Sequence, residues 1–316
     1  MEKTPMKFLL SLLLLVSITR ATAQDQRDML IIVSAAGNAT YAPEFQRQAT
    51  TWQNLASQAE ISATTFGLGE ETKEEDLSLV EKNLTALPKA GGDLWLVLIG
   101  HGSFDGRTAN FNLRGKDLDP AAFKSLLNPF TRRLIILNLF SASYPFLAPL
   151  AGENRIIISS NRSEGERNYS RFGAKFADAL TSPAADLDLD GSSSLLEITL
   201  HASAATQVFY QDAQRVLQEH AVLDDNGDAF PTPTTAFIGL QAAPSATTPP
   251  DGPTAREIYL LNPTSDPLPP VAKAQRAELE ASIATLRQNK PNIQEQEYYV
   301  QLENLMRKMA EIYQKK

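Results

Sequence analysis

The chain of 316 residues contains no cysteine. Cysteine peptidase activity, disulfide bonds and lipoprotein anchoring through a cysteine are therefore excluded, and the packing of the core has to supply the stability. The chain also has no cluster of Lys and Arg, and its formal net charge is -8. Because phosphate binding needs clustered basic side chains, nucleic acid is not an expected partner.

The N-terminus carries an apolar run that is too short for a membrane-spanning helix, which needs about 20 residues. The run extends from Phe8 to Ile18, follows Lys3 and Lys7, and is followed by a small-residue site that ends at Ala23. A basic start, a short apolar middle and a small-x-small site predict a secretory signal peptide, residues 1–23. The protein is then secreted or periplasmic, without a stable membrane span; an uncleaved membrane anchor is the alternative.

Short apolar runs alternate with amphipathic stretches over residues 24–240. Buried strands are expected at 29–33, 61–66, 94–99, 134–140 and 155–159. Helices are expected at about 43–58, 74–86, 120–127 and 167–180. Strands of this length, separated by helices, predict an α/β domain with a mostly parallel sheet flanked by helices.

The composition changes after this domain. Residues 241–270 are rich in Pro, Thr and Ala, which predicts a linker, interrupted by one apolar segment that docks on the domain. Residues 271–316 then carry two apolar stripes at helical spacing with a break at Pro291, which predicts an antiparallel helical hairpin. The hairpin either forms a coiled coil that binds a partner or oligomerises, or it caps the domain.

Two candidate catalytic side chains follow predicted strands. His101 comes directly after the run at 94–99, and Ser141 comes directly after the run at 134–140. The carboxyl ends of parallel strands face the crevice where α/β proteins bind ligands. We therefore expect both side chains at one edge of the sheet.

The motifs around these residues resemble the legumain branch of the caspase-type (clan CD, C13-type) cysteine peptidases, which carries His-Gly-Ser and Ala-Cys-Glu-Ser-Gly. His101, Gly102 and Ser103 match the first motif. In the second, Ser143 matches and Ser141 stands where the family has the nucleophilic cysteine.

The resemblance covers roughly residues 28–180 and implies a caspase-like fold. It also implies His101 and Ser141 at the catalytic positions, with Gly102, Ser103 and Ser143 lining the site or the oxyanion hole. Phe140, Ala142 and Tyr144 depart from the second motif. No third catalytic residue is assigned.

The replacement of cysteine by serine favours an exported pseudopeptidase that binds a peptide or a protein. A serine hydroxyl is far less acidic than a thiol and needs a well-placed general base to become a nucleophile. An active Ser-His hydrolase, a peptidase that uses Ser141 and His101, is the alternative. A purely structural, calcium-stabilised envelope component is a third possibility.

Residues 186–197 match the twelve-residue EF-hand loop D-x-D-x-D-G-x5-E. The candidate ligands for Ca2+ are Asp186, Asp188, Asp190, Ser192 and Glu197. Carboxylates at this spacing supply the oxygen atoms that calcium prefers, and Gly at the sixth position permits the sharp turn. No organic cofactor is expected.

Two positions of this loop depart from the template, since Leu189 and Ser193 stand where polar and aliphatic residues are usual. The alternative is an acidic surface loop that caps a helix starting near Ser194. A second acidic cluster at 224–228 lacks the last carboxylate of the template and is interpreted as a turn. His201 and His220 are placed in a helical stretch, 195–220, as ordinary helix residues.

Overall fold

The computed structural model describes residues 26–70, 73–243, 249–261 and 269–314. The predicted signal peptide, residues 1–23, lies outside these ranges. Among the described helices, none is both long and apolar enough to cross a bilayer.

The core of the protein is a seven-stranded sheet with the order β2-β1-β3-β6-β7-β8-β9. Strands β1, β2, β3, β6 and β7 are parallel, and β8 and β9 continue the sheet in antiparallel pairing. The strands are β1 Asp28–Val33, β2 Ser62–Phe66, β3 Leu94–Gly100, β6 Leu134–Phe140, β7 Arg155–Ser159, β8 Val222–Asp224 and β9 Thr232–Pro233. This is the mostly parallel α/β sheet that the sequence predicts.

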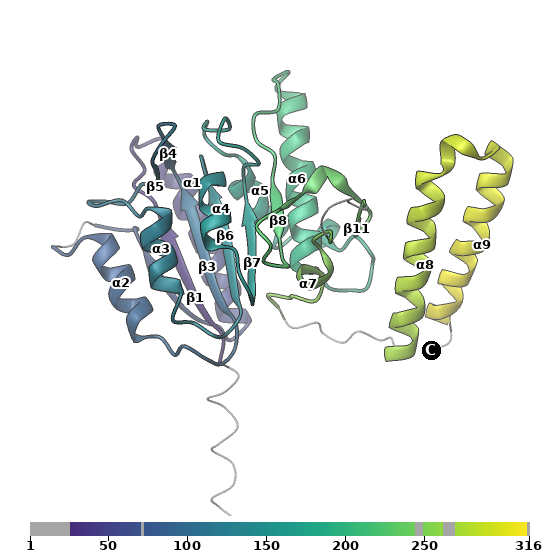
Figure 1. Ribbon diagram of the computed structural model, residues 1–316, viewed down its shortest axis with the longest axis horizontal. Helices are drawn as coiled ribbons and strands as arrows, with labels where there is room; N and C mark the ends of the chain where they lie inside the picture. Colours follow the sequence, from purple (N-terminus) through teal and green to yellow (C-terminus); the bar gives the residue numbers. More distant parts are fainter. Residues whose placement is uncertain (1–25, 71–72, 244–248, 262–268, 315–316) are drawn as a thin grey trace, which may run out of the picture.

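Helices cover both faces of the sheet (Figure 1). One face is covered by α1 Ala42–Gln58, α5 Phe172–Ala179 and α6 Leu195–Asp212. The other is covered by α2 Asp76–Ala86, α3 Pro120–Leu127 and α4 Leu147–Leu150. Alternate residues of the central strands point into the two layers, so these strands are mostly apolar, with Asn138 of β6 and Asp28 of β1 as buried polar residues.

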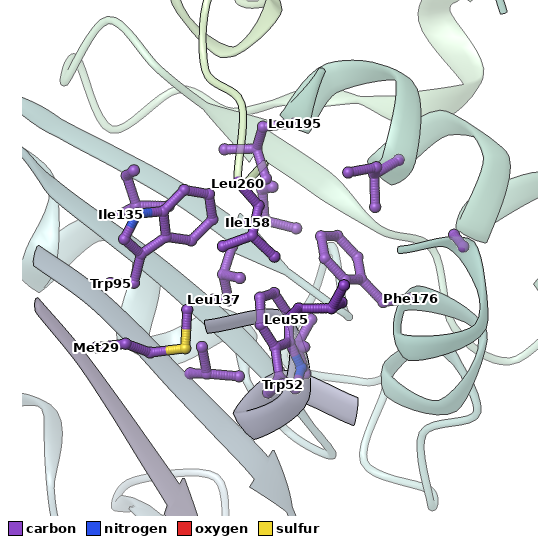
Figure 2. Close-up of a cluster of buried hydrophobic side chains, with 14 of the residues drawn as sticks. Met29, Trp52, Leu55, Trp95, Ile135, Leu137, Ile158, Phe176, Leu195 and Leu260 are labelled. Carbon is purple, nitrogen blue, oxygen red and sulfur yellow. The ribbon is translucent and has the colours of Figure 1, made fainter. Parts of the chain in front are cut away.

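In the layer between α1, α5 and the sheet, the rings of Trp52, Trp95 and Phe176 lie among aliphatic side chains, as Figure 2 shows. Trp52 of α1 stacks on Phe176 of α5 with ring centroids 5.9 Å apart. Trp52 also meets Trp95 of β3 at 6.4 Å. Both tryptophan side chains are at most 1% exposed, so this cluster is a large part of the hydrophobic stabilisation.

Three expectations about these elements need correction. The strand at 61–66 is not buried, because β2 lies at the edge of the sheet and Ser62 and Ala63 are exposed. The helix expected from 167 begins at Phe172, since the carboxylate of Glu219 accepts the backbone N–H groups of Arg171 and Phe172 at the helix start.

The helix expected over 195–220 ends earlier. Helix α6 stops at Asp212, and Gln214 adopts a positive φ of 53° that a continuing helix could not accommodate. His201 lies in α6 as expected, but His220 lies beyond it and pairs with Glu166 through Nδ1 and Oε1 at 2.6 Å.

The remaining short elements lie in the connections. They are β4 Gly102–Phe104, β5 Ala109–Phe111, β10 Phe237–Ile238, β11 Gln241–Ala242, α7 Pro253–Arg256, and the 3-10 turns η1 Tyr144–Phe146, η2 Pro183–Ala185 and η3 Thr234–Ala236. Within the Pro-rich stretch, Ala255, Ile258 and Leu260 are buried in the core. The apolar segment expected to dock there therefore does so.

The C-terminal helices are α8 Pro270–Gln288 and α9 Glu295–Gln314, joined by η4 Lys290–Asn292. They run antiparallel and lie beside the sheet domain, next to the region of α6, α7 and β11 (Figure 1). Leu286 and Tyr298 are buried near the turn. The helical hairpin has the form that its two apolar stripes predict.

Candidate functional site

His101 lies directly beyond the carboxyl end of β3. Gly100 before it has a φ of +123°, and a Cβ atom there would lie 2.1 Å from Ser34 Oγ, so only glycine fits. The His101 backbone N–H donates to Ser34 Oγ at 2.8 Å. This close approach ties the end of β3 to the residue that follows β1.

The His101 ring is partly buried and packs against three aromatic rings. Its centroid lies 4.7 Å from Tyr41, 5.1 Å from Phe45 and 5.5 Å from Tyr169. Burial lowers the His101 pKa, and a hydrogen bond with the Ala36 backbone partly opposes this. The imidazole is therefore neutral at pH 7 and has no carboxylate to hold its charged form.

Ser141 lies at the carboxyl end of the neighbouring strand β6 and is 3% exposed. Its Oγ accepts the backbone N–H of Gly102 at 3.2 Å and donates to the Gly102 carbonyl at 3.3 Å. Across the described residues, no hydrogen bond joins Ser141 Oγ to the His101 ring. The structure thus brings both predicted residues to one edge of the sheet, with Gly102 between them.

Gly102 is packed so tightly that no other residue fits. A Cβ atom there would lie 2.5 Å from the Ser141 carbonyl oxygen and 2.6 Å from the Phe140 ring. Ala142, which follows Ser141, has a φ of +57°, a left-handed conformation that is costly for a residue with a side chain. The backbone of the Ser141 turn is therefore held firmly against Gly102.

The other two serines of the motifs have different environments. Ser143 is fully buried, and its Oγ bonds Ser159 Oγ at 2.8 Å and Asn161 Oδ1 at 3.0 Å. Ser103 is exposed in β4 and donates to Asn112 Oδ1 at 3.0 Å. Ser143 supports the turn from inside the domain, and Ser103 lies on its surface.

The sequence analysis missed the aromatic enclosure of His101. Tyr41 and Phe45 belong to the start of α1, and Tyr169 belongs to the loop before α5. That loop is fixed by Glu219, which also accepts the Ser170 hydroxyl at 2.6 Å. Aromatic residues in a loop give no signal of a site, and only the fold brings these segments together.

A cavity of about 390 Å³ opens beside the enclosure. Tyr41 and Tyr169 form part of its wall, together with Arg171 and Lys175, and His101 and Ser141 do not line it. The Arg171 guanidinium lies 4.7 Å above the Tyr169 ring. The cavity beside the His101 rings is thus lined by aromatic rings and by charged side chains of both signs, since Glu44 and Asp178 also line it.

The acidic loop, residues 186–197, brings three carboxylates together. Asp186, Asp188 and Asp190 each offer an oxygen within 4.8 Å of the others. Burial and the neighbouring charge of Asp188 raise the pKa of Asp190. These three aspartates could hold a metal ion, because carboxylate oxygens are the ligands that Ca2+ prefers.

Glu197 is not part of this group of three carboxylates, because backbone N–H groups occupy both of its oxygens. Its Oε2 accepts the backbone N–H of Ser194 at 2.8 Å, and Ser194 Oγ accepts the N–H of Glu197 in return, which is a capping box at the start of α6. Its Oε1 accepts the N–H groups of Leu187 and Asp188. Ser192, the other proposed ligand, donates its N–H to Asp190 Oδ1 at 3.0 Å.

The second acidic cluster is a turn, as expected. Asp224 accepts the backbone N–H groups of Gly227 and Ala229 at 2.8 and 2.9 Å. Behind it, Asp251 accepts the N–H of Asp225 at 2.9 Å. Burial next to Asp225 raises the pKa of Asp251 to about 6.

Comparison with known proteins finds likeness at the level of solved structures alone. No family model matches the chain, and no curated protein matches it. The Drosophila initiator caspase Dronc is similar at 13% identity and a TM-score of 0.42, over 64% of this chain and 80% of that one. Caspase-1 from Spodoptera frugiperda is similar at 10% identity and a TM-score of 0.41, over 64% and 87%. At these values the likeness concerns the arrangement of helices and strands, and no residue role or activity is drawn from it.

Proposed function

We propose that this protein is an inactive member of the caspase/legumain type, of the C13 branch, and that it binds a peptide or a protein without cleaving it. The observation that carries the proposal is the hydrogen bond from the Gly102 N–H to Ser141 Oγ, at 3.2 Å. Three features of the site support it: the environment of the Ser141 hydroxyl, the hydrogen bond of the Gly102 N–H and the packing around His101.

The hydroxyl of Ser141 is in the wrong environment for a nucleophile. It is 3% exposed, and its proton goes to the Gly102 carbonyl rather than to an imidazole nitrogen. A serine becomes nucleophilic when a general base takes this proton. Here the proton is held by a carbonyl, which is not a base at neutral pH.

The Gly102 amide is also occupied. In acyl transfer, backbone N–H groups aimed at the developing oxyanion supply a large share of the rate enhancement. The Gly102 N–H is the amide that the resemblance assigns to this role, and it donates to Ser141 Oγ instead. The side chain that replaces the thiol therefore blocks the amide that a substrate would need.

His101 is only partly exposed, because Tyr41, Phe45 and Tyr169 pack against its ring. The cavity of about 390 Å³ next to these rings is where we place the peptide or protein ligand. Its lining combines aromatic rings with the cations Arg171 and Lys175, while Arg47 is paired with Glu44 and Asp178. Such a lining suits an extended segment that presents aromatic side chains and an acidic group.

A fluorophosphonate probe tests the absence of nucleophilic chemistry. Wild-type protein and Ser141→Ala should both remain unlabelled, while a known serine hydrolase in the same tube is labelled. Ser103→Ala is the matched control, because Ser103 is an exposed serine close to the site. Labelling of wild type and of Ser103→Ala, but not of Ser141→Ala, would establish the alternative, an active Ser-His hydrolase.

Further parts of the proposal concern the rest of the chain. We propose that residues 1–23 are removed on export to the periplasm or the exterior, that the acidic loop binds Ca2+, and that the hairpin of residues 271–316 mediates oligomerisation. N-terminal sequencing of the mature protein tests the first, isothermal titration with CaCl2 the second, and sedimentation of the chain with and without its hairpin the third.

A further inference from the structure

The acidic loop is bound by two arginines that come from outside it. Arg276 of α8 is 9% exposed in its side chain, and its guanidinium lies 3.3 Å from Asp188 Oδ2 and 3.4 Å from Asp190 Oδ2. Arg256, at the end of α7, lies 3.0 Å from Asp188 Oδ2. Two guanidinium groups thus share one carboxylate oxygen of the loop.

A second ion pair connects the hairpin to the domain. Glu280 of α8 accepts a hydrogen bond from the Arg256 guanidinium. Arg276 and Glu280 are four residues apart, on one face of α8. Two charged side chains of α8 therefore contact the domain: Arg276 pairs with the acidic loop, and Glu280 pairs with Arg256.

Apolar packing contributes little to this contact. Within the described part of the chain, the close neighbours of α8 are α9 and η4, and no strand or helix of the sheet domain packs extensively against it. A cavity of about 460 Å³ separates the two sides. It is lined by Leu187, Leu189 and Leu240 of the domain and by Ile283, Met306 and Met309 of the hairpin.

One oxygen of the loop has no partner in this arrangement. The Asp188 side chain is 10% exposed, and its Oδ1 atom is buried and makes no hydrogen bond. A buried carboxylate oxygen without a partner costs free energy. The two arginines pair with Asp188 Oδ2 and leave Oδ1 without a partner. A carboxylate oxygen of this kind is a ligand atom that a divalent cation uses.

We propose that a divalent cation and Arg276 compete for the carboxylates of Asp188 and Asp190, so that cation binding releases the C-terminal hairpin from the acidic loop. This inference rests on the Ca2+ binding proposed above and gives it a consequence. A cation surrounded by oxygen ligands repels the nearby guanidinium, and the ion pair is then lost. The apolar residues on both sides of the cavity become accessible to water or to another protein.

The competition has a thermodynamic signature. If the cation weakens docking of the hairpin, then removal of docking strengthens cation binding by the same factor. Couplings of this kind are about 5- to 150-fold. We expect Arg276→Gln to bind Ca2+ at least about 5-fold more tightly than wild type. Arg307→Gln is the matched control, an exposed arginine of the hairpin whose ion-pair partner, Glu303, lies on its own helix.

The position of the hairpin is measured on the full mature chain. Because the chain has no cysteine, Ser282→Cys on α8 and Asp212→Cys at the end of α6 can carry a pair of spin labels without further changes. Adding CaCl2 should shift the distance distribution from one narrow peak to a broad one at longer distances. Combined with Arg276→Gln, the same pair should give the broad distribution before any CaCl2 is added. NaCl at equal ionic strength separates cation binding from screening.

The outcomes distinguish this inference from the proposals it rests on. Uptake of Ca2+ with an unchanged distance distribution would overturn the release and leave calcium binding intact. An unchanged Ca2+ affinity in Arg276→Gln would overturn the competition. Absence of Ca2+ uptake in wild type and in Arg276→Gln would overturn both the calcium site and the release. None of these results bears on Ser141, which the fluorophosphonate probe tests separately.

Discussion

Ser141→Cys restores the side chain that the resemblance requires, and we expect it to remain without peptidase activity. The position is 3% exposed, and the only hydrogen-bond partners of its hydroxyl among the described residues are the Gly102 N–H and carbonyl. Burial lowers the pKa of His101, so its neutral imidazole offers no positive charge to stabilise a thiolate. Of the two partners, the Gly102 N–H is the donor that would favour the thiolate, and burial disfavours it.

The magnitude follows from the thiolate fraction. An ordinary thiol with a pKa of about 8.5 is roughly 3% ionised at pH 7. Burial makes this an upper limit. Because the thiolate is the species that attacks, alkylation at pH 7 should be at least about 30-fold slower than for a fully ionised catalytic cysteine.

Alkylation by iodoacetamide as a function of pH provides the assay. The natural chain has no cysteine, so all of the signal comes from position 141. The rate should rise with a midpoint at or above pH 8.5, and Ser103→Cys, on the surface, should react faster at every pH. A midpoint below pH 7 in Ser141→Cys, or cleavage of a peptide library by it, would refute the claim that the site has lost its catalytic geometry.

Three further perturbations test the packing and the electrostatics. Tyr169→Ala should open the enclosure and raise the His101 pKa towards its ordinary value, as an NMR titration of the ring would measure; an unchanged pKa would show that Tyr169 is not part of the cause. The raised pKa of Asp251, about 6, means that the folded state favours its protonated form, so its contribution to stability is present in acid and is lost as the pH rises from about 4 to about 6. In urea unfolding, Asp251→Asn should remove up to about 3 kcal/mol of the change in unfolding free energy over this pH range. The same change with pH in both proteins would contradict the prediction. Trp52→Ala should lower the free energy of unfolding by about 3–5 kcal/mol, and a loss under 1 kcal/mol would show that the aromatic cluster is not a main part of the core.

The fold was predictable from the sequence where local pattern and burial agree. Strands β3 and β6 lie within one residue of the predicted runs, because strands buried on both faces of a sheet are nearly continuous apolar runs. The start of α5 was not predictable, since Glu219, distant along the chain, determines it. The exposure of β2 depends on its place at the edge of the sheet, which the strand itself does not encode.

The candidate site was predictable in position and not in environment. Strand ends place His101 and Ser141 at one edge, and this needed only the parallel topology. The rings around His101 come from the start of α1 and from the loop before α5, and the partner of the Ser141 hydroxyl is a backbone group. Neither leaves a pattern in the residue types. The sequence did not predict the arginines that pair with the acidic loop for the same reason, because nothing in the pattern around Arg256 or Arg276 distinguishes them from surface residues.

The environment of Ser141 explains why one substitution can remove more than a nucleophile. A serine hydroxyl is a better hydrogen-bond acceptor than a thiol, and at this position it takes the Gly102 N–H for itself. On the proposed function, the oxyanion donor and the nucleophile are then lost together, because one hydroxyl occupies the amide that a substrate oxygen would need. His101 would have no reacting group to serve, and the packing of Tyr41, Phe45 and Tyr169 against its ring then serves the stability of the domain.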